Sequence, residues 1–166
     1  MGPAGVTIVI IRDDLVARSA GRKASLPTML SYAVHAENKS LYNTPATFAI
    51  YAVGLVMKWL AGQGGLAAIA KLNERKAAKL YTEVVRTGFY RGTARKEHRS
   101  LMNITFRLRN AEKDKEFLAG AQAKDMDGLK GHRSVGGFRA SIYNAFPIEG
   151  CCALADYLHA FAAANP

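Results

Sequence analysis

The sequence predicts a mixed α/β chain whose second half folds as a small α+β unit. Two stretches, Met102–Leu108 and Phe138–Tyr143, alternate apolar and polar residues with the period of a β-strand. In the first of them, Ile104 and Phe106 point to the same face. Helical patterns lie between and after these strands, which indicates helices packed on one face of an open sheet.

The first half contains one strongly apolar strand pattern and one strongly apolar helix pattern. Val6–Ile11 is a continuous β-branched run, typical of a strand buried on both faces of a covered sheet. Residues 45–61 are apolar on every side, which predicts a buried helix. Thr44 suits its N-cap and Pro45 its first position. The N-terminus of this helix could hold a phosphate through its free N–H groups and dipole, although an ordinary capped helix start is the simpler interpretation.

The remaining elements follow from turn residues and helical periodicity. They are a short helix or turn at 12–17, a loop at 19–28, an extended piece at 32–35, a long amphipathic helix at 66–86, a basic connection at 90–100, a helix capped by Asn110 at 111–124, and a helix that begins at Pro147. The cations of the long helix, Lys76 among them, are expected in solvent. We place a domain boundary inside that helix, which gives domains 1–69 and 70–166.

Composition limits the possible partners. The chain has 166 residues and a formal net charge of +10, which suits nucleic acid, anionic membranes or small anions. The cations are dispersed, without a basic stripe interleaved with aromatic residues, so we expect no nucleic-acid partner. Thr7–Ile11 is too short to cross a bilayer, and the start of the chain lacks a signal-peptide pattern. We therefore expect a cytoplasmic protein with no membrane partner.

Two adjacent cysteines, Cys151 and Cys152, lie in the predicted last helix. Neighbours in a helix point to different faces, so this pair is poorly placed for a mutual disulfide or for a shared metal. We expect small core residues in a reducing compartment, and no metal site.

A basic turn at Gly131–Asn144 is the strongest candidate for chemistry. It contains His132, Arg133 and Arg139 around a Gly-Gly pair. Arginine presents a planar fork of donors that matches carboxylate and phosphate oxygens, and protonated histidine adds another donor. The pattern predicts a pocket for a substrate with two anionic groups. A hairpin with exposed basic residues explains the same pattern equally well.

Four blocks of this sequence resemble the phosphoserine aminotransferases, a pyridoxal-phosphate family of the aspartate-aminotransferase fold type. The blocks are Gly2–Ile10, Tyr42–Phe48, Arg99–Phe106 and Lys130–Asn144. The resemblance covers the whole chain but only the C-terminal part of a family member. It implies that residues 1–69 are the end of a large cofactor-binding domain of fold type I, and that residues 70–166 are the small C-terminal α+β domain.

The resemblance also implies roles for individual residues. Arg139 would hold the α-carboxylate of the substrate, and His132 with Arg133 would help to hold its phosphate. Asn43 and Thr44 would reach the phosphate of pyridoxal 5'-phosphate in the neighbouring subunit of a homodimer. The implied reaction converts 3-phosphohydroxypyruvate and L-glutamate to O-phospho-L-serine and 2-oxoglutarate, and related chemistry serves pyridoxine biosynthesis.

One departure bears on activity. The resemblance places the Schiff-base lysine just before the Gly-Pro-Ala-Gly turn at Gly2–Gly5, a position that precedes Met1. We therefore expect this chain alone to bind no cofactor covalently and to be inactive. The alternative, from another functional class, is a non-catalytic module that binds phosphorylated acids or serves assembly. We also expect the apolar residues of 6–11 and 45–61 to be partly exposed in this chain and to drive self-association.

Overall fold

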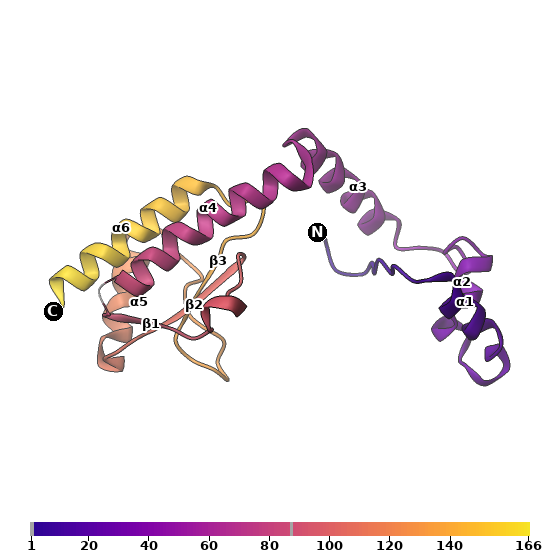
Figure 1. Ribbon diagram of the computed structural model, residues 1–166, viewed down its shortest axis with the longest axis horizontal. Coiled ribbons are helices and arrows are strands. Elements are labelled where there is room, and N and C mark those ends of the chain that lie inside the picture. The colour runs from indigo at the N-terminus through magenta and orange to yellow at the C-terminus, as the bar shows by residue number, and fades with distance from the viewer. Residues whose placement is uncertain (1, 87) are drawn as a thin grey trace. The chain divides into compact units, whose positions relative to one another are not determined.

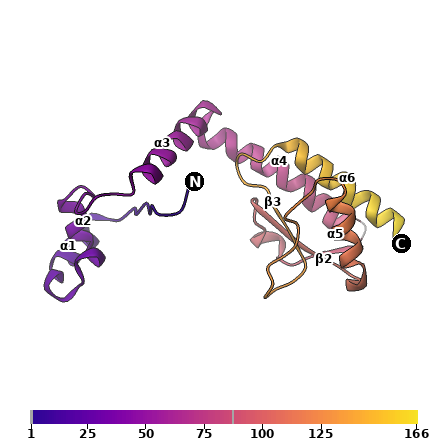
Figure 2. The same ribbon diagram turned by 180° about the vertical axis from the view of Figure 1, so that it is seen from behind.

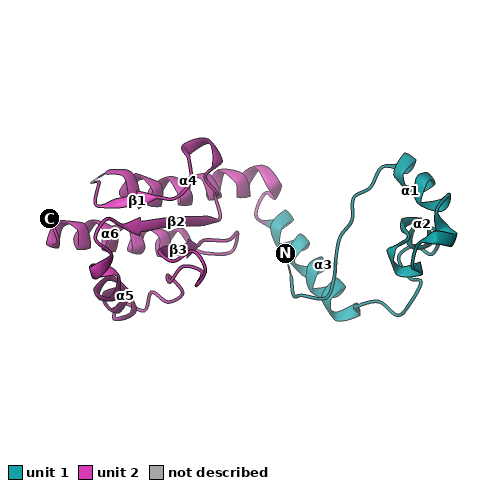
Figure 3. Cartoon of the chain, turned by 90° about the horizontal axis from the view of Figure 1, so that it is seen from below, with its two compact units in different colours: residues 1–62 teal, residues 63–166 magenta. Residues whose placement is uncertain are grey.

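The computed structural model describes residues 2–86 and 88–166, and the chain divides into two compact units. The first unit ends at Gly62 and the second begins at Gln63 (Figure 3). This division lies just before the long helix, whereas the boundary predicted near Ala70 falls inside that helix and stays a prediction. Each unit is described below by itself.

The second unit is built on an antiparallel sheet in the order β1-β2-β3 (Figure 1). The strands are β1, Tyr90–Gly92; β2, Asn103–Leu108; and β3, Phe138–Ser141. Ile104 and Phe106 are both buried, which confirms the period of two predicted for the second strand. The first strand was missed, since only three residues of the predicted basic connection pair with β2.

Three helices pack against one face of this sheet. They are α4, Gly65–Arg86; α5, Asp114–Gln122; and α6, Ile148–Ala164. Figures 1 and 2 both show α4 and α6 side by side. Aromatic rings of α5, α6 and the sheet form the centre of the core, where Phe117 contacts Phe106, Phe138 and Phe161. The predicted α+β arrangement is thus confirmed.

The helix ends in this unit follow the predicted signals closely. Asn110 accepts a hydrogen bond from the backbone N–H of Glu112, and a short 3-10 turn leads into α5. Pro147 is the N-cap of α6. Cys151 is fully buried in α6, Cys152 is half-buried, and both are free thiols.

One prediction for α4 is wrong in an informative way. Lys76 was expected in solvent, yet its side chain is completely buried. The ammonium group donates hydrogen bonds to backbone carbonyls of the segment that joins β3 to α6. A helical pattern places a residue on a side of the helix, but it does not show which backbone atoms another segment brings there.

The first unit contains α1, Asp13–Ala20; α2, Tyr32–Glu37; and α3, Thr47–Gly62. Residues 32–35 were predicted to be extended and are helical instead. The predicted strand at Val6–Ile11 is also wrong, since these residues form no strand in the structure. A strand needs neighbours for its backbone hydrogen bonds, and the described part of this unit offers none.

Helix α3 begins two residues later than Pro45, at Thr47. Its predicted burial is wrong: only Ala49 and Leu60 are buried, while Phe48 is 78% exposed. Ile10 in the preceding segment is 98% exposed. The expected exposure of both apolar segments in this chain is therefore confirmed. No single described helix is long and apolar enough to span a membrane; α3 and α4 pass that test only when counted together as one broken segment.

Candidate functional site

The predicted basic turn is a tight hairpin in the second unit. The backbone N–H of Gly131 donates to the Gly137 carbonyl at 2.8 Å, and the N–H of Arg139 donates to the Leu129 carbonyl at 2.8 Å. A β-carbon on Gly131 would lie 2.3 Å from the Gly136 carbonyl oxygen, so only glycine fits at this crossing. The hairpin therefore fixes His132 and Arg133 at its tip and feeds directly into β3.

The tip presents its basic side chains to solvent. His132 and Arg133 are both exposed. The backbone N–H of Ser134 donates to Nδ1 of His132 at 3.3 Å, and the Ser134 hydroxyl lies 2.7 Å from the same nitrogen. Since Nδ1 accepts in this arrangement, neutral His132 carries its proton on Nε2. On the exposed side chain of His132, this Nε2–H is a donor suited to an anion.

Arg107 on β2 braces this hairpin, and sequence reasoning missed it. Its guanidinium donates to the Val135 carbonyl within the hairpin loop. Its side chain runs across Gly137, where an added β-carbon would lie 2.8 Å from Arg107 Cγ and 2.8 Å from the Phe106 carbonyl oxygen. The only available signal was the position of Arg107 on the polar side of an alternating strand.

Arg139 lies on the exposed face of β3, directly opposite Thr105 of β2. It lines a cavity of about 510 Å³. The other walls come from the 124–129 segment and from the start of α6, including Asp127 and Gly150. A cavity of this size suits a small molecule, and Arg139 is a donor suited to a carboxylate within it.

The structure brings the predicted substrate residues together only in part. His132 and Arg133 share a hairpin with Arg139 but do not line its cavity. A larger cavity of about 600 Å³, between Phe89, Arg109 and the end of α6, contains none of the predicted site residues.

Asn43 and Thr44 belong to the first unit and precede α3. Both are exposed, and the Asn43 side-chain amide donates to the Thr44 carbonyl at 3.1 Å. A hydroxyl and an amide just ahead of a helix N-terminus are suitable donors for a phosphate, so these residues fit the phosphate of pyridoxal phosphate.

A second group that sequence reasoning missed lies behind the hairpin. Besides Lys76, Asn73 of α4 donates through Nδ2 to Asn144 Oδ1 at 2.8 Å. Together they fasten the segment after β3 to α4. That segment begins within a few residues of Arg139, so α4 fixes the end of the strand that carries it.

Comparison with known proteins shows the family of this chain. The family model of class-V aminotransferases matches residues 1–154. The chain is 52% identical to a phosphoserine aminotransferase of Desulfotalea psychrophila over 166 residues, which is 100% of this chain and 45% of that protein. It is 54% identical to one of Lysinibacillus sphaericus over 159 residues, covering 95% of this chain and 43% of that protein.

Solved structures give the same result. The phosphoserine aminotransferase of Bacillus circulans subsp. alkalophilus superposes with a TM-score of 0.84 at 46% identity, over 94% of this chain and 43% of that one. A pyridoxal-phosphate-bound phosphoserine aminotransferase from Trichomonas vaginalis gives a TM-score of 0.75 at 37% identity, over 81% of this chain and 39% of that one. This chain spans less than half the length of these relatives, and it belongs to the class-V aminotransferases, a family of pyridoxal-phosphate enzymes.

Proposed function

We propose that this chain supplies substrate-binding and cofactor-binding residues of a phosphoserine aminotransferase. The reaction transfers an amino group between L-glutamate and 3-phosphohydroxypyruvate, and it yields O-phospho-L-serine and 2-oxoglutarate. It belongs to L-serine biosynthesis, and with a related phosphorylated substrate it serves pyridoxine biosynthesis. The observation that carries the proposal is Arg139, placed on the open face of β3 and lining a small-molecule cavity.

The two ends of the substrate require different donors. Arg139 offers a planar pair of N–H groups to the α-carboxylate, and it is held by a strand whose backbone is bonded on both sides. His132 and Arg133, on the hairpin tip, are the donors for the phosphate. In a dimeric enzyme the tip can serve a partner's site while Arg139 serves its own.

The cofactor would be held through its phosphate by Asn43 and Thr44, from the neighbouring subunit of a cytoplasmic homodimer. When bound, pyridoxal phosphate supplies the electron sink that amino-group transfer requires. The protein residues described here bind and orient anionic groups.

The alternative is a non-catalytic module that binds phosphorylated acids or serves assembly. The exposed apolar side chains of α3 favour the assembly role, because surface of this kind marks protein contacts. Both hypotheses use Arg139, but only the first requires the cofactor-phosphate role of Asn43 and Thr44.

Calorimetric titration of the chain with O-phospho-L-serine tests the proposed residues. We expect Arg139→Ala to weaken binding about tenfold or more, since a charge-assisted pair of hydrogen bonds is lost. The double variant His132→Gln, Arg133→Gln should weaken binding of O-phospho-L-serine but not of L-serine, which lacks the phosphate. Arg75→Ala, an exposed arginine on α4, is the matched control. Equal affinities of Arg139→Ala and Arg75→Ala would exclude the carboxylate role.

A second titration separates the two hypotheses. Inorganic phosphate and pyridoxal phosphate are compared on the wild-type chain and on the variant Asn43→Ala, Thr44→Ala. A loss of pyridoxal-phosphate affinity in the variant supports the enzyme hypothesis. Equal affinity in both proteins favours the binding module.

A further inference from the structure

We propose that Arg91 and Arg107 form a second oxyanion site on the open face of the sheet, specific for a phosphate-type dianion. These two arginines are direct cross-strand partners in the register of β1 and β2. Residues directly opposite each other have their Cβ atoms about 4.5–5.5 Å apart, and like charges at such a pair are destabilising. A dianion between the two guanidinium groups converts this repulsion into attraction.

The pair lies on the face of the sheet opposite to the one that packs against α4, α5 and α6. Tyr90, Phe106 and Leu108 point into the core, so the alternating residues 91 and 107 point the other way. Both arginine side chains are exposed. They line a hollow of about 320 Å³ with Gly92, Thr93 and Val135, which is at the small end of the range for ligand pockets. Its size and polar lining suit a phosphate group.

Neither arginine has an ion-pair partner in the described parts of the chain. Burial raises the pKa of Asp114, and the nearby Arg107 offsets this rise only in part. Arg107 also donates to the Val135 carbonyl. A guanidinium has five N–H donors, so these contacts leave Arg107 free to bind an anion together with Arg91.

The hollow is lined by none of His132, Arg133 and Arg139. Arg139 lies on the same face of the sheet, opposite Thr105, which is two residues from Arg107 on β2. Val135 lines the hollow and belongs to the hairpin loop that carries His132 and Arg133, so the hollow adjoins that loop.

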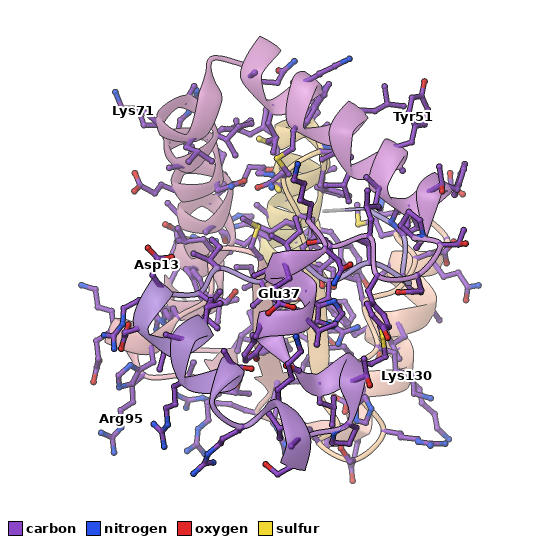
Figure 4. The ribbon with its side chains drawn as sticks, turned by 90° about the vertical axis from the view of Figure 1, so that its right-hand side faces the viewer. Asp13, Glu37, Tyr51, Lys71, Arg95 and Lys130 are labelled. Carbon is purple, nitrogen blue, oxygen red and sulfur yellow. The ribbon has the colours of Figure 1, made fainter. Side chains whose placement is uncertain are left out.

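The test is a calorimetric titration of the chain with inorganic phosphate, at an ionic strength held constant with chloride. We expect saturable binding with a Kd of about 1 mM or tighter, as two charge-assisted contacts allow. Arg91→Gln and Arg107→Gln should each weaken phosphate binding about tenfold. Arg91→Gln removes no contact of the hairpin, so it still tests the proposal if Arg107→Gln misfolds. The matched control is Arg95→Gln, an exposed arginine three residues beyond β1 that projects into solvent (Figure 4).

Two further arms locate the bound anion. The double variant His132→Gln, Arg133→Gln, which removes the proposed phosphate donors of the hairpin tip, should still show one saturable phosphate site. Phosphate should also protect Arg91 and Arg107 from phenylglyoxal in a mass-spectrometric map. The proposal is overturned if Arg91→Gln binds phosphate as tightly as Arg95→Gln. It is also overturned if the double variant loses all binding, because the anion then sits on the hairpin tip. Neither result bears on the proposed function, because that is tested separately by the affinity of Arg139→Ala for O-phospho-L-serine.

Discussion

Replacing Lys76 with methionine should destabilise the second unit markedly, because its buried ammonium group ties down the segment after β3. The Lys76 Nζ lies 2.8 Å from the Tyr143 carbonyl oxygen and 3.2 Å from those of Ile142 and Phe146, with Asn144 at 3.5 Å. An ammonium has three N–H groups, so about three of these bonds form at once. Methionine has a similar length and no donor.

The magnitude follows from two opposing effects. Hydrogen bonds that involve a charged group contribute about 1.5–3 kcal/mol each, and the buried carbonyls would lose their donor. Burial of the ammonium costs several kcal/mol, which the variant recovers. We expect a net loss of about 3 kcal/mol in the free energy of unfolding. For a unit of this size the loss corresponds to a Tm about 10–20 °C lower.

Far-UV circular dichroism during urea unfolding is the suitable assay. The single tryptophan, Trp59, lies in α3 of the other unit, so its fluorescence would not report on this one. Lys79→Met, an exposed lysine on the same helix, is the control and should change stability by less than about 0.5 kcal/mol. If Lys76→Met unfolds at the same urea concentration as Lys79→Met, the carbonyl contacts do not stabilise the fold.

The pH dependence of the same pair of proteins gives an independent check. Burial lowers the pKa of Lys76 below its usual 10.5, and the nearby Cys151 offsets this only in part. Between the lowered pKa and 10.5 the unfolded chain therefore binds more protons at this group than the folded chain. Stability contributed by Lys76 rises with pH across that window. The stability difference between wild type and Lys76→Met should grow toward pH 10.5; a difference that shrinks would refute the reasoning.

Three further predictions concern the hairpin, the first unit and the cofactor. Gly137→Ala should cost at least about 1 kcal/mol more in unfolding free energy than Gly128→Ala: both have positive φ, but only Gly137 has the Phe106 carbonyl 2.8 Å from a new β-carbon. Light scattering should show self-association of the chain that Phe48→Ser reduces, because Phe48 is 78% exposed; a monomeric wild type would contradict this. Pyridoxal phosphate mixed with the chain should be removed completely by dialysis, and a visible absorbance band that survives and maps to one lysine would show otherwise.

Local patterns predicted the elements of the second unit well, apart from the short strand β1. These predictions used residues that are close together in the chain. They are the alternation in β2, the periodicity of α4 and the caps at Asn110 and Pro147. The same kind of evidence failed for Val6–Ile11. Its β-branched residues favour a strand, but a strand forms only where another strand accepts its hydrogen bonds.

The candidate site was likewise predictable only in part. Residue types and the family resemblance identified His132, Arg133 and Arg139, and their roles remain proposals. The pattern could not predict that Arg107 braces the hairpin or that Arg91 faces Arg107, because both contacts depend on strand register.

The sequence by itself determined the family, the helices of the second unit with its strands β2 and β3, and the basic residues suited to anionic groups. These features depend on local periodicity and on side-chain chemistry. Only the tertiary structure decided that Lys76 is buried among backbone carbonyls and that Arg91 lies opposite Arg107. It also decided that Arg139 lines a cavity that His132 and Arg133 do not line. Each of these facts joins residues far apart in the chain, and only packing and strand register bring them together.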